Sequence, residues 1–158
     1  MNDWLELVLR IAAAVAAGGA VGLNRDLFGR PTGVRVHALV ALGAAIAVMT
    51  AQALGEPGAV SRTIQGVLGG IGFLGAGVIM RSNAGRETGA RDVDIRHLTT
   101  AASIWLTAAL GIAAGLGFWR LGLLATGAAL VVLVTGLWID QALFAKFGYE
   151  EDRHRPRK

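Results

Sequence analysis

The residues that could do chemistry gather in one short polar stretch between two long apolar segments. They combine an amide, two guanidinium groups, a carboxylate and an imidazole, namely Asn24, Arg25, Asp26, Arg35 and His37. Arg25, Asp26 and Arg35 can form an ion-paired cluster that fixes how the two flanking segments meet. The alternative interpretation is ordinary positive charge beside a turn that contains Pro and Gly. These five residues are the candidate functional motif.

His37 lies at the start of an apolar segment, where an ionisable residue is a functional-site candidate by default. As a single histidine it can also hydrogen-bond a neighbouring carbonyl. No second His or carboxylate stands at a metal-ligand spacing from it, and the chain has no cysteine. We therefore predict neither a metal site nor a cofactor. The sequence contains no hydrolase triad, P-loop or zinc-protease motif, so we do not expect an enzyme.

Charge-free runs define the elements that must position this motif. The chain is 54% hydrophobic and only 16% charged, whereas soluble domains are about a quarter charged. Runs of 20, 18, 22 and 19 residues without Asp, Glu, Lys or Arg lie at 36–55, 63–80, 98–119 and 121–139. A helix of about 20 residues crosses a bilayer core of about 30 Å. The sequence predicts an all-α polytopic membrane bundle over residues 1–140 and a short basic tail at 141–158.

The first segment, at about 4–24, reaches the length of a membrane span only if its charged N-terminal part is included. Glu6 and Arg10 are four residues apart, so they can pair on one helix face near the membrane boundary. Trp4 suits an interfacial anchor. With this segment included, we predict about five transmembrane helices.

The arginines and lysines predict the topology. Twelve of the 15 lie within residues 25–35, 81–96 and 141–158, which alternate along the predicted spans. The positive-inside rule places these regions in the cytoplasm, with the N-terminus outside and the C-terminus inside. The positive charge is thereby explained by topology, and we do not expect a nucleic-acid partner.

Glycines are abundant inside the predicted spans. Three G-x-x-x-G pairs occur, and the segment 63–80 contains Gly66, Gly69, Gly70, Gly72, Gly75 and Gly77. Small residues let helices approach closely in lipid. We therefore expect this segment to be the central helix, or else the seam of a homodimer. The alternative is a broken helix that exposes carbonyls to an ion.

Hydroxyl groups open the segment 98–119. Thr99 or Thr100 can cap its N-terminus, and Thr99 shares a helix face with Ser103. Hydrogen bonding of these hydroxyls to neighbouring helices is the expected role.

Three blocks of the sequence, at 22–44, 70–79 and 98–111, resemble the MgtC/SapB family of membrane proteins in content and order. The resemblance implies a multi-pass protein of the bacterial inner membrane that is linked to magnesium homeostasis. It also implies regulation of other membrane proteins, with the F-type ATP synthase as one partner. This chain has Asn24 where the family usually has an acidic residue, and we expect it to lack the cytosolic C-terminal domain of the virulence-type members.

Two functions follow from these observations. The first is a non-enzymatic regulator that presents the polar motif and the glycine-rich helices to a partner protein or to a second copy of itself. The second is a transporter or channel for Mg²⁺ or another ion. No Asp or Glu lies in the middle of the four spans from residue 36 onward, and Mg²⁺ prefers carboxylate oxygens. This absence favours the regulator.

Overall fold

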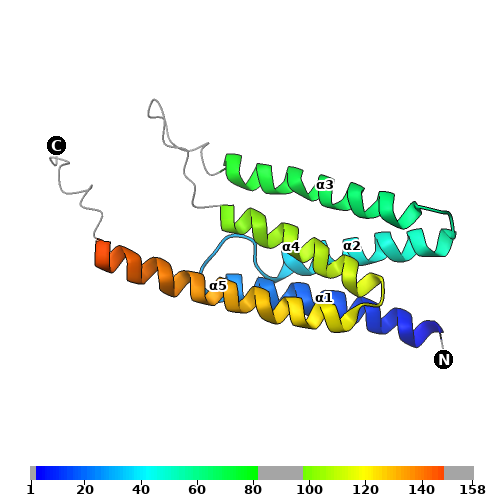
Figure 1. The fold of residues 1–158 in the computed structure, drawn as a ribbon, viewed down its shortest axis with the longest axis horizontal. Helices are drawn as coiled ribbons and strands as arrows, with labels where there is room; N and C mark the ends of the chain where they lie inside the picture. Colours follow the sequence, from blue (N-terminus) through cyan, green and yellow to red (C-terminus); the bar gives the residue numbers. More distant parts are fainter. Residues whose placement is uncertain (1–2, 82–97, 148–158) are drawn as a thin grey trace.

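The computed structural model describes residues 3–81 and 98–147, and within these ranges it consists of five α-helices without a β-strand (Figure 1). The helices are α1 (Asp3–Leu27), α2 (Val34–Leu54), α3 (Ala59–Arg81), α4 (Leu98–Gly115) and α5 (Trp119–Phe147). The predicted all-α fold is confirmed. Helix α5 continues beyond the predicted end of its span and into the segment that we expected to be a tail.

Four of the five helices are long and apolar enough to cross a membrane. Helix α3 has 23 residues, which is also enough to span a bilayer core, but over its described residues it is not among these four. The multi-pass architecture is therefore established on four helices. Membrane crossing by α3 stays a prediction.

The helices run alternately up and down the bundle (Figure 1). The α1–α2 connection, the end of α3 and the start of α4 lie at one end, which we call the loop end. The start of α1 and the two short turns, α2–α3 and α4–α5, lie at the other, which we call the N-terminal end. This alternation matches the sides predicted from the arginines, whereas the orientation in the membrane stays a prediction.

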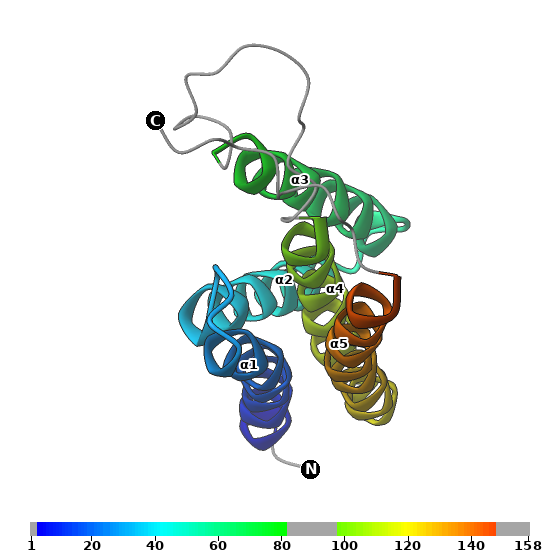
Figure 2. The ribbon, with the colours of Figure 1, turned by 90° about the vertical axis from the view of Figure 1, so that its left-hand side faces the viewer.

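Helix α4 is the centre of the described bundle. It contacts all four other helices, whereas α3 contacts only α2 and α4 and lies apart from α1 and α5 (Figure 2). The prediction that the segment 63–80 is central is therefore wrong. A Cβ atom built on Gly66, Gly70, Gly72 or Gly77 would meet nothing within 4 Å, and only Gly75 lies against Ala101. Apart from Gly75, the glycines of α3 face open space among the residues that the structure describes.

The other two glycine pairs pack as the sequence predicts, and both pack on α2. On α1, a Cβ at Gly18 would lie 2.5 Å from the His37 carbonyl oxygen, and one at Gly22 would lie 2.6 Å from Val34 Cα. On α4, a Cβ at Gly111 would overlap the Ala41 carbonyl. Because no side chain intervenes, backbones meet directly on both sides of α2.

This packing predicts a specific sensitivity to added methyl groups. We expect Gly111→Ala to destabilise the bundle by about 1–3 kcal/mol, because the new methyl must displace α2. Gly70→Ala is the matched control, since its methyl enters open space and alanine favours a helix by up to about 1 kcal/mol. Thermal unfolding in detergent, followed by circular dichroism, measures both. Equal stability of the two variants would contradict this packing.

Candidate functional site

Arg25 is the one buried cation among the residues whose burial the structure describes. It lies in the last turn of α1 and only 5% of its surface is exposed. Its Nη2 donates a hydrogen bond to Thr100 Oγ1, in the first turn of α4. Its Nε has no partner in the structure and is shielded from solvent. Among the described residues, the one hydrogen-bond partner of this charge is a neutral hydroxyl. Burying a charge with so little compensation is costly, which marks this position as more than a packing site.

Asp26 holds the start of α2. Its Oδ2 accepts a hydrogen bond of 2.9 Å from the backbone N–H of Val34, the first residue of α2. A carboxylate at this place satisfies a free helix donor and complements the helix dipole. A Cβ at Gly33 would overlap this carboxylate, so only glycine leaves room for the contact.

His37 joins α2 to α4 and is fully buried. Its Nδ1 lies 3.1 Å from the Gly33 carbonyl oxygen, which can only accept, so Nδ1 carries a proton. Its Nε2 lies 3.3 Å from Ser103 Oγ, which in turn lies 2.8 Å from the Thr100 carbonyl oxygen. The single Ser103 proton can serve either Nε2 or that carbonyl, so the protonation of His37 and the direction of the Ser103 hydroxyl are linked.

The structure brings Arg25, His37, Thr100 and Ser103 together in one buried network, but it does not form the predicted ion-paired cluster. The ion pairs of the described residues are Glu6–Arg10 and Glu56–Arg62. Arg25 and Asp26 are adjacent on α1, so their side chains leave the helix in directions about 100° apart.

The remaining members of the predicted motif lie outside this network. Asp26 and Arg35 are exposed, and Asn24 is half-buried. Thr99, which was expected to hydrogen-bond at the start of the fourth helix, is exposed as well. Of the two threonines, the buried Thr100 accepts a hydrogen bond from the neighbouring helix α1. Capping of α4 by either threonine stays a prediction.

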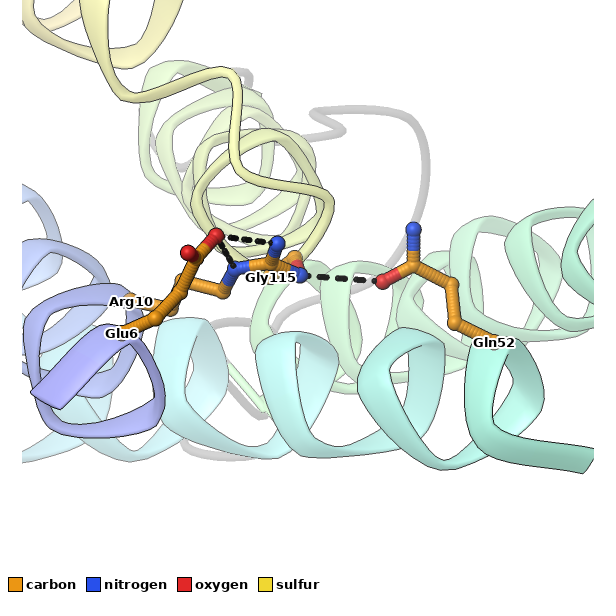
Figure 3. Close-up of polar contacts among 4 residues, drawn as sticks. All are labelled: Glu6, Arg10, Gln52 and Gly115. Atoms are coloured by element: carbon orange, nitrogen blue, oxygen red, sulfur yellow. Dashed lines mark hydrogen bonds and ion pairs between the residues drawn. The ribbon is translucent and has the colours of Figure 1, made fainter. Parts of the chain in front are cut away.

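A second polar cluster, at the N-terminal end, was not predicted as a site. Arg10 donates to Glu6 Oε1 at 2.6 Å, to the Gly115 carbonyl at 2.9 Å and to Gln52 Oε1 at 3.1 Å, as Figure 3 shows. The Glu6–Arg10 pair confirms the sequence prediction. The bond to Gly115 places a cation at the carbonyl end of α4, where a cation is favourable. The sequence offered one signal for this cluster, because Arg10 and Gln52 lie near the same end of two apolar segments.

Carboxylates are absent from the buried polar groups that the structure describes. These groups are Arg25, His37, Thr100, Ser103, Thr107 and Thr126. In the same part of the chain, no three His, Cys, Asp or Glu side chains lie close enough to hold a metal ion. The buried network can therefore donate hydrogen bonds and relay a proton, but among the described residues it lacks the carboxylate oxygens on which divalent-cation sites depend.

The apolar helices and the polar clusters at the two ends of the bundle define a multi-pass α-helical protein of the bacterial inner membrane. The family model of the MgtC family matches residues 11–142, and the chain belongs to this family.

Curated relatives support the assignment. The chain is 46% identical over 138 residues to Protein SrpB of Synechococcus elongatus, an alignment that covers 84% of this chain and 75% of SrpB. It is 34% identical over 135 residues to Protein MgtC of Salmonella typhimurium, covering 85% of this chain but 53% of MgtC. It is 35% identical over 136 residues to the Escherichia coli K12 protein named "Putative magnesium transporter YhiD", covering 81% and 59%.

The chain thus spans little more than half the length of its MgtC and YhiD relatives. No solved structure matches it.

The Arg25–Thr100 contact predicts unequal roles for two neighbouring threonines. We expect Thr100→Val to destabilise the protein by about 1–3 kcal/mol, because it leaves the buried guanidinium without its hydroxyl partner. Thr99→Val, at the exposed neighbour, should change stability by less than about 0.5 kcal/mol. Chemical unfolding in detergent measures the difference, and two equal losses would show that the contact is not important.

The Gly33–Asp26 contact predicts a coupled pair. We expect Gly33→Ala to cost about 1–3 kcal/mol, because its methyl overlaps the Asp26 carboxylate. Asp26→Ala removes the cap of α2 and should cost about 1 kcal/mol. The double variant should be more stable than the sum of the two losses, because the alanine at 33 then has room. Strict additivity in a double-mutant cycle would exclude the overlap.

Proposed function

We propose that this protein is a non-enzymatic regulator of another integral membrane protein, and that it serves magnesium homeostasis. Membership of the MgtC family and the name of the YhiD relative support a magnesium-related membrane protein. The finer assignment, regulator in place of transporter, rests on the buried polar network.

The observation that carries the proposal is the sign of the buried charge. Arg25 is buried at the loop end, and no carboxylate accompanies it among the buried groups of residues 3–81 and 98–147. A Mg²⁺ ion entering the bundle there would be repelled by the guanidinium and would find hydroxyls in place of carboxylates. Such an interior suits a fixed scaffold better than a cation path.

The exposed side of the same region suits a docking site. Asp26 fixes the start of α2, and Arg35 stands beside it, exposed and on a rigid first helical turn. Charged residues on rigid elements direct partner choice more than affinity. The proposed partner is an integral membrane protein such as the F-type ATP synthase.

A second copy of the chain is a further proposed partner. The open glycine face of α3 allows close helix approach in lipid, and we expect a homodimer through this face. Crosslinking in membranes of a Gly66→Leu, Gly70→Leu double variant, compared with the unmodified chain, tests it. Undiminished dimer in the variant would exclude α3 as the seam.

The alternative function is a transporter or channel for Mg²⁺ or another ion. Only the glycine-rich sequence of α3 favours it, since such a sequence suits a broken helix that exposes backbone carbonyls to an ion.

Purified protein in sealed liposomes with an internal Mg²⁺ indicator separates the two functions. We expect no Mg²⁺ uptake above that of empty liposomes. In cells at low magnesium, we expect Arg35→Ala to reduce growth support at least severalfold at unchanged protein level, because Arg35 contributes to the partner surface and not to the fold. Arg120→Ala, an exposed arginine at the opposite end, is the control. Saturable uptake that depends on Asp26 would establish the transporter instead.

A further inference from the structure

The N-terminal end of the bundle contains a crevice between the first half of α1 and the start of α5. Its volume is about 570 Å³, within the range of about 300–1,000 Å³ that small-molecule sites occupy. Leu9, Ala13 and Leu123 line its apolar part. Helices α1 and α5 lie on neighbouring sides of α4, so this crevice is outside the central packing (Figure 2).

The surroundings of this crevice are hydrocarbon. Both α1 and α5 are long and apolar enough to cross the membrane, and Leu9 and Leu123 are largely exposed at its sides. Such a lining offers too few polar partners for water to fill the crevice. An alkyl chain is the occupant that the lining suits.

The polar end of the crevice is formed by Arg10 and Glu6. Arg10 directs its donors to acceptors inside the protein, at Glu6, Gln52 and Gly115. Glu6 Oε1 accepts two hydrogen bonds from Arg10, one from Nε and one from Nη2, and no described residue donates to Glu6 Oε2 (Figure 3). The Glu6 side chain is 47% exposed and that of Arg10 is 24% exposed. The crevice therefore presents a partly exposed carboxylate oxygen to which none of residues 3–81 and 98–147 donates a hydrogen bond.

An aromatic residue marks the depth of this end in the bilayer. Trp119 lines the crevice at the first residue of α5, and the Arg120 guanidinium lies 5.2 Å from the centre of its ring. A tryptophan with a neighbouring cation is typical of the membrane–water interface. The carboxylate of Glu6 is thus placed at the level of lipid headgroups, with the apolar lining below it.

We propose that this crevice binds a phospholipid with a primary-amine headgroup. One acyl chain packs against Leu9, Ala13 and Leu123, and the headgroup ammonium donates a hydrogen bond to Glu6 Oε2. A primary ammonium supplies both a positive charge and N–H donors, whereas a trimethylated one supplies no donor and a glycerol headgroup supplies no positive charge. The site is independent of the proposed regulatory function, since it uses none of its residues.

The test uses the full chain, incorporated into vesicles of phosphatidylethanolamine, phosphatidylcholine and phosphatidylglycerol in equal amounts and then extracted in mild detergent. Native mass spectrometry measures the lipids that stay bound. Glu6→Gln keeps the Oε1 acceptor for Arg10 but removes the charge. Leu9→Trp fills the apolar part. Glu56→Gln is the matched control, because Glu56 is likewise exposed and paired with an arginine at the same end.

We expect one phosphatidylethanolamine to be retained by the unmodified chain and by Glu56→Gln. Its retention should fall about fivefold in Glu6→Gln, as for the loss of an exposed ion pair. In Leu9→Trp all lipid classes should be lost. Equal retention of the three lipids, undiminished retention in Glu6→Gln, or no bound lipid at all would each overturn the proposal. If Leu9→Trp fails to fold, the comparison of Glu6→Gln with Glu56→Gln decides.

Discussion

Direct backbone contact on both sides of α2 is the constraint on which the rest of the structure depends. Helices in lipid gain little from burying apolar surface, so close packing and polar contacts must hold them. Glycines of α1 and α4 lie against the backbone of α2. Helix α2 contributes small buried side chains to this core, the alanines at 41, 44 and 45. The three helices form a core of small side chains, on which α3 packs against α2 and α4 and α5 packs against α1 and α4.

The close approach of these helices also makes the polar clusters possible. Side chains such as His37 and Ser103 reach each other only because the backbones of α2 and α4 lie so close. At the loop end, Arg25 and Asp26 leave α1 in different directions, one towards α4 and the other towards α2. At the opposite end, Arg10 contacts the same two helices. The three-helix core is thus held by polar contacts at both ends, with small apolar residues between them.

Much of the fold could be predicted from charge spacing alone, because a bilayer imposes a length on every helix. The five helices, the alternation of their ends and the Glu6–Arg10 pair all followed from local sequence. The identity of the central helix could not be predicted in this way. Glycine content indicates only that close approach is possible, and nothing in the segment 63–80 says whether a neighbour uses it. In α3 the chain leaves that surface open, and the crowded position belongs to α4.

The sequence identified residues of the candidate site but not the contacts that they make. Arg25, Asp26 and His37 stood out because ionisable groups beside apolar segments are costly. Their partners are 8 to 75 residues distant, at Val34 and at Thr100 and Ser103. Such pairings depend on how helices rotate against each other, which a periodic apolar sequence does not specify. For the same reason, the sequence did not identify Gln52 and Gly115 as partners of Arg10.

The length of chain between Arg10 and its partner Gly115, 105 residues, has a consequence for biogenesis. A membrane protein enters the bilayer from its N-terminus while synthesis continues, so α1 and α2 are inserted before α4 exists. During that interval the carbonyl that Arg10 will bind and the hydroxyl that Arg25 will bind are both missing. The first hairpin must then be held by contacts of its own, which are the glycines of α1 on α2, the Asp26 cap and the Glu6 and Gln52 side chains. Insertion of α4 completes both arginine contacts, so this step joins α1 to α4 at both ends of the bundle before α5 packs against them.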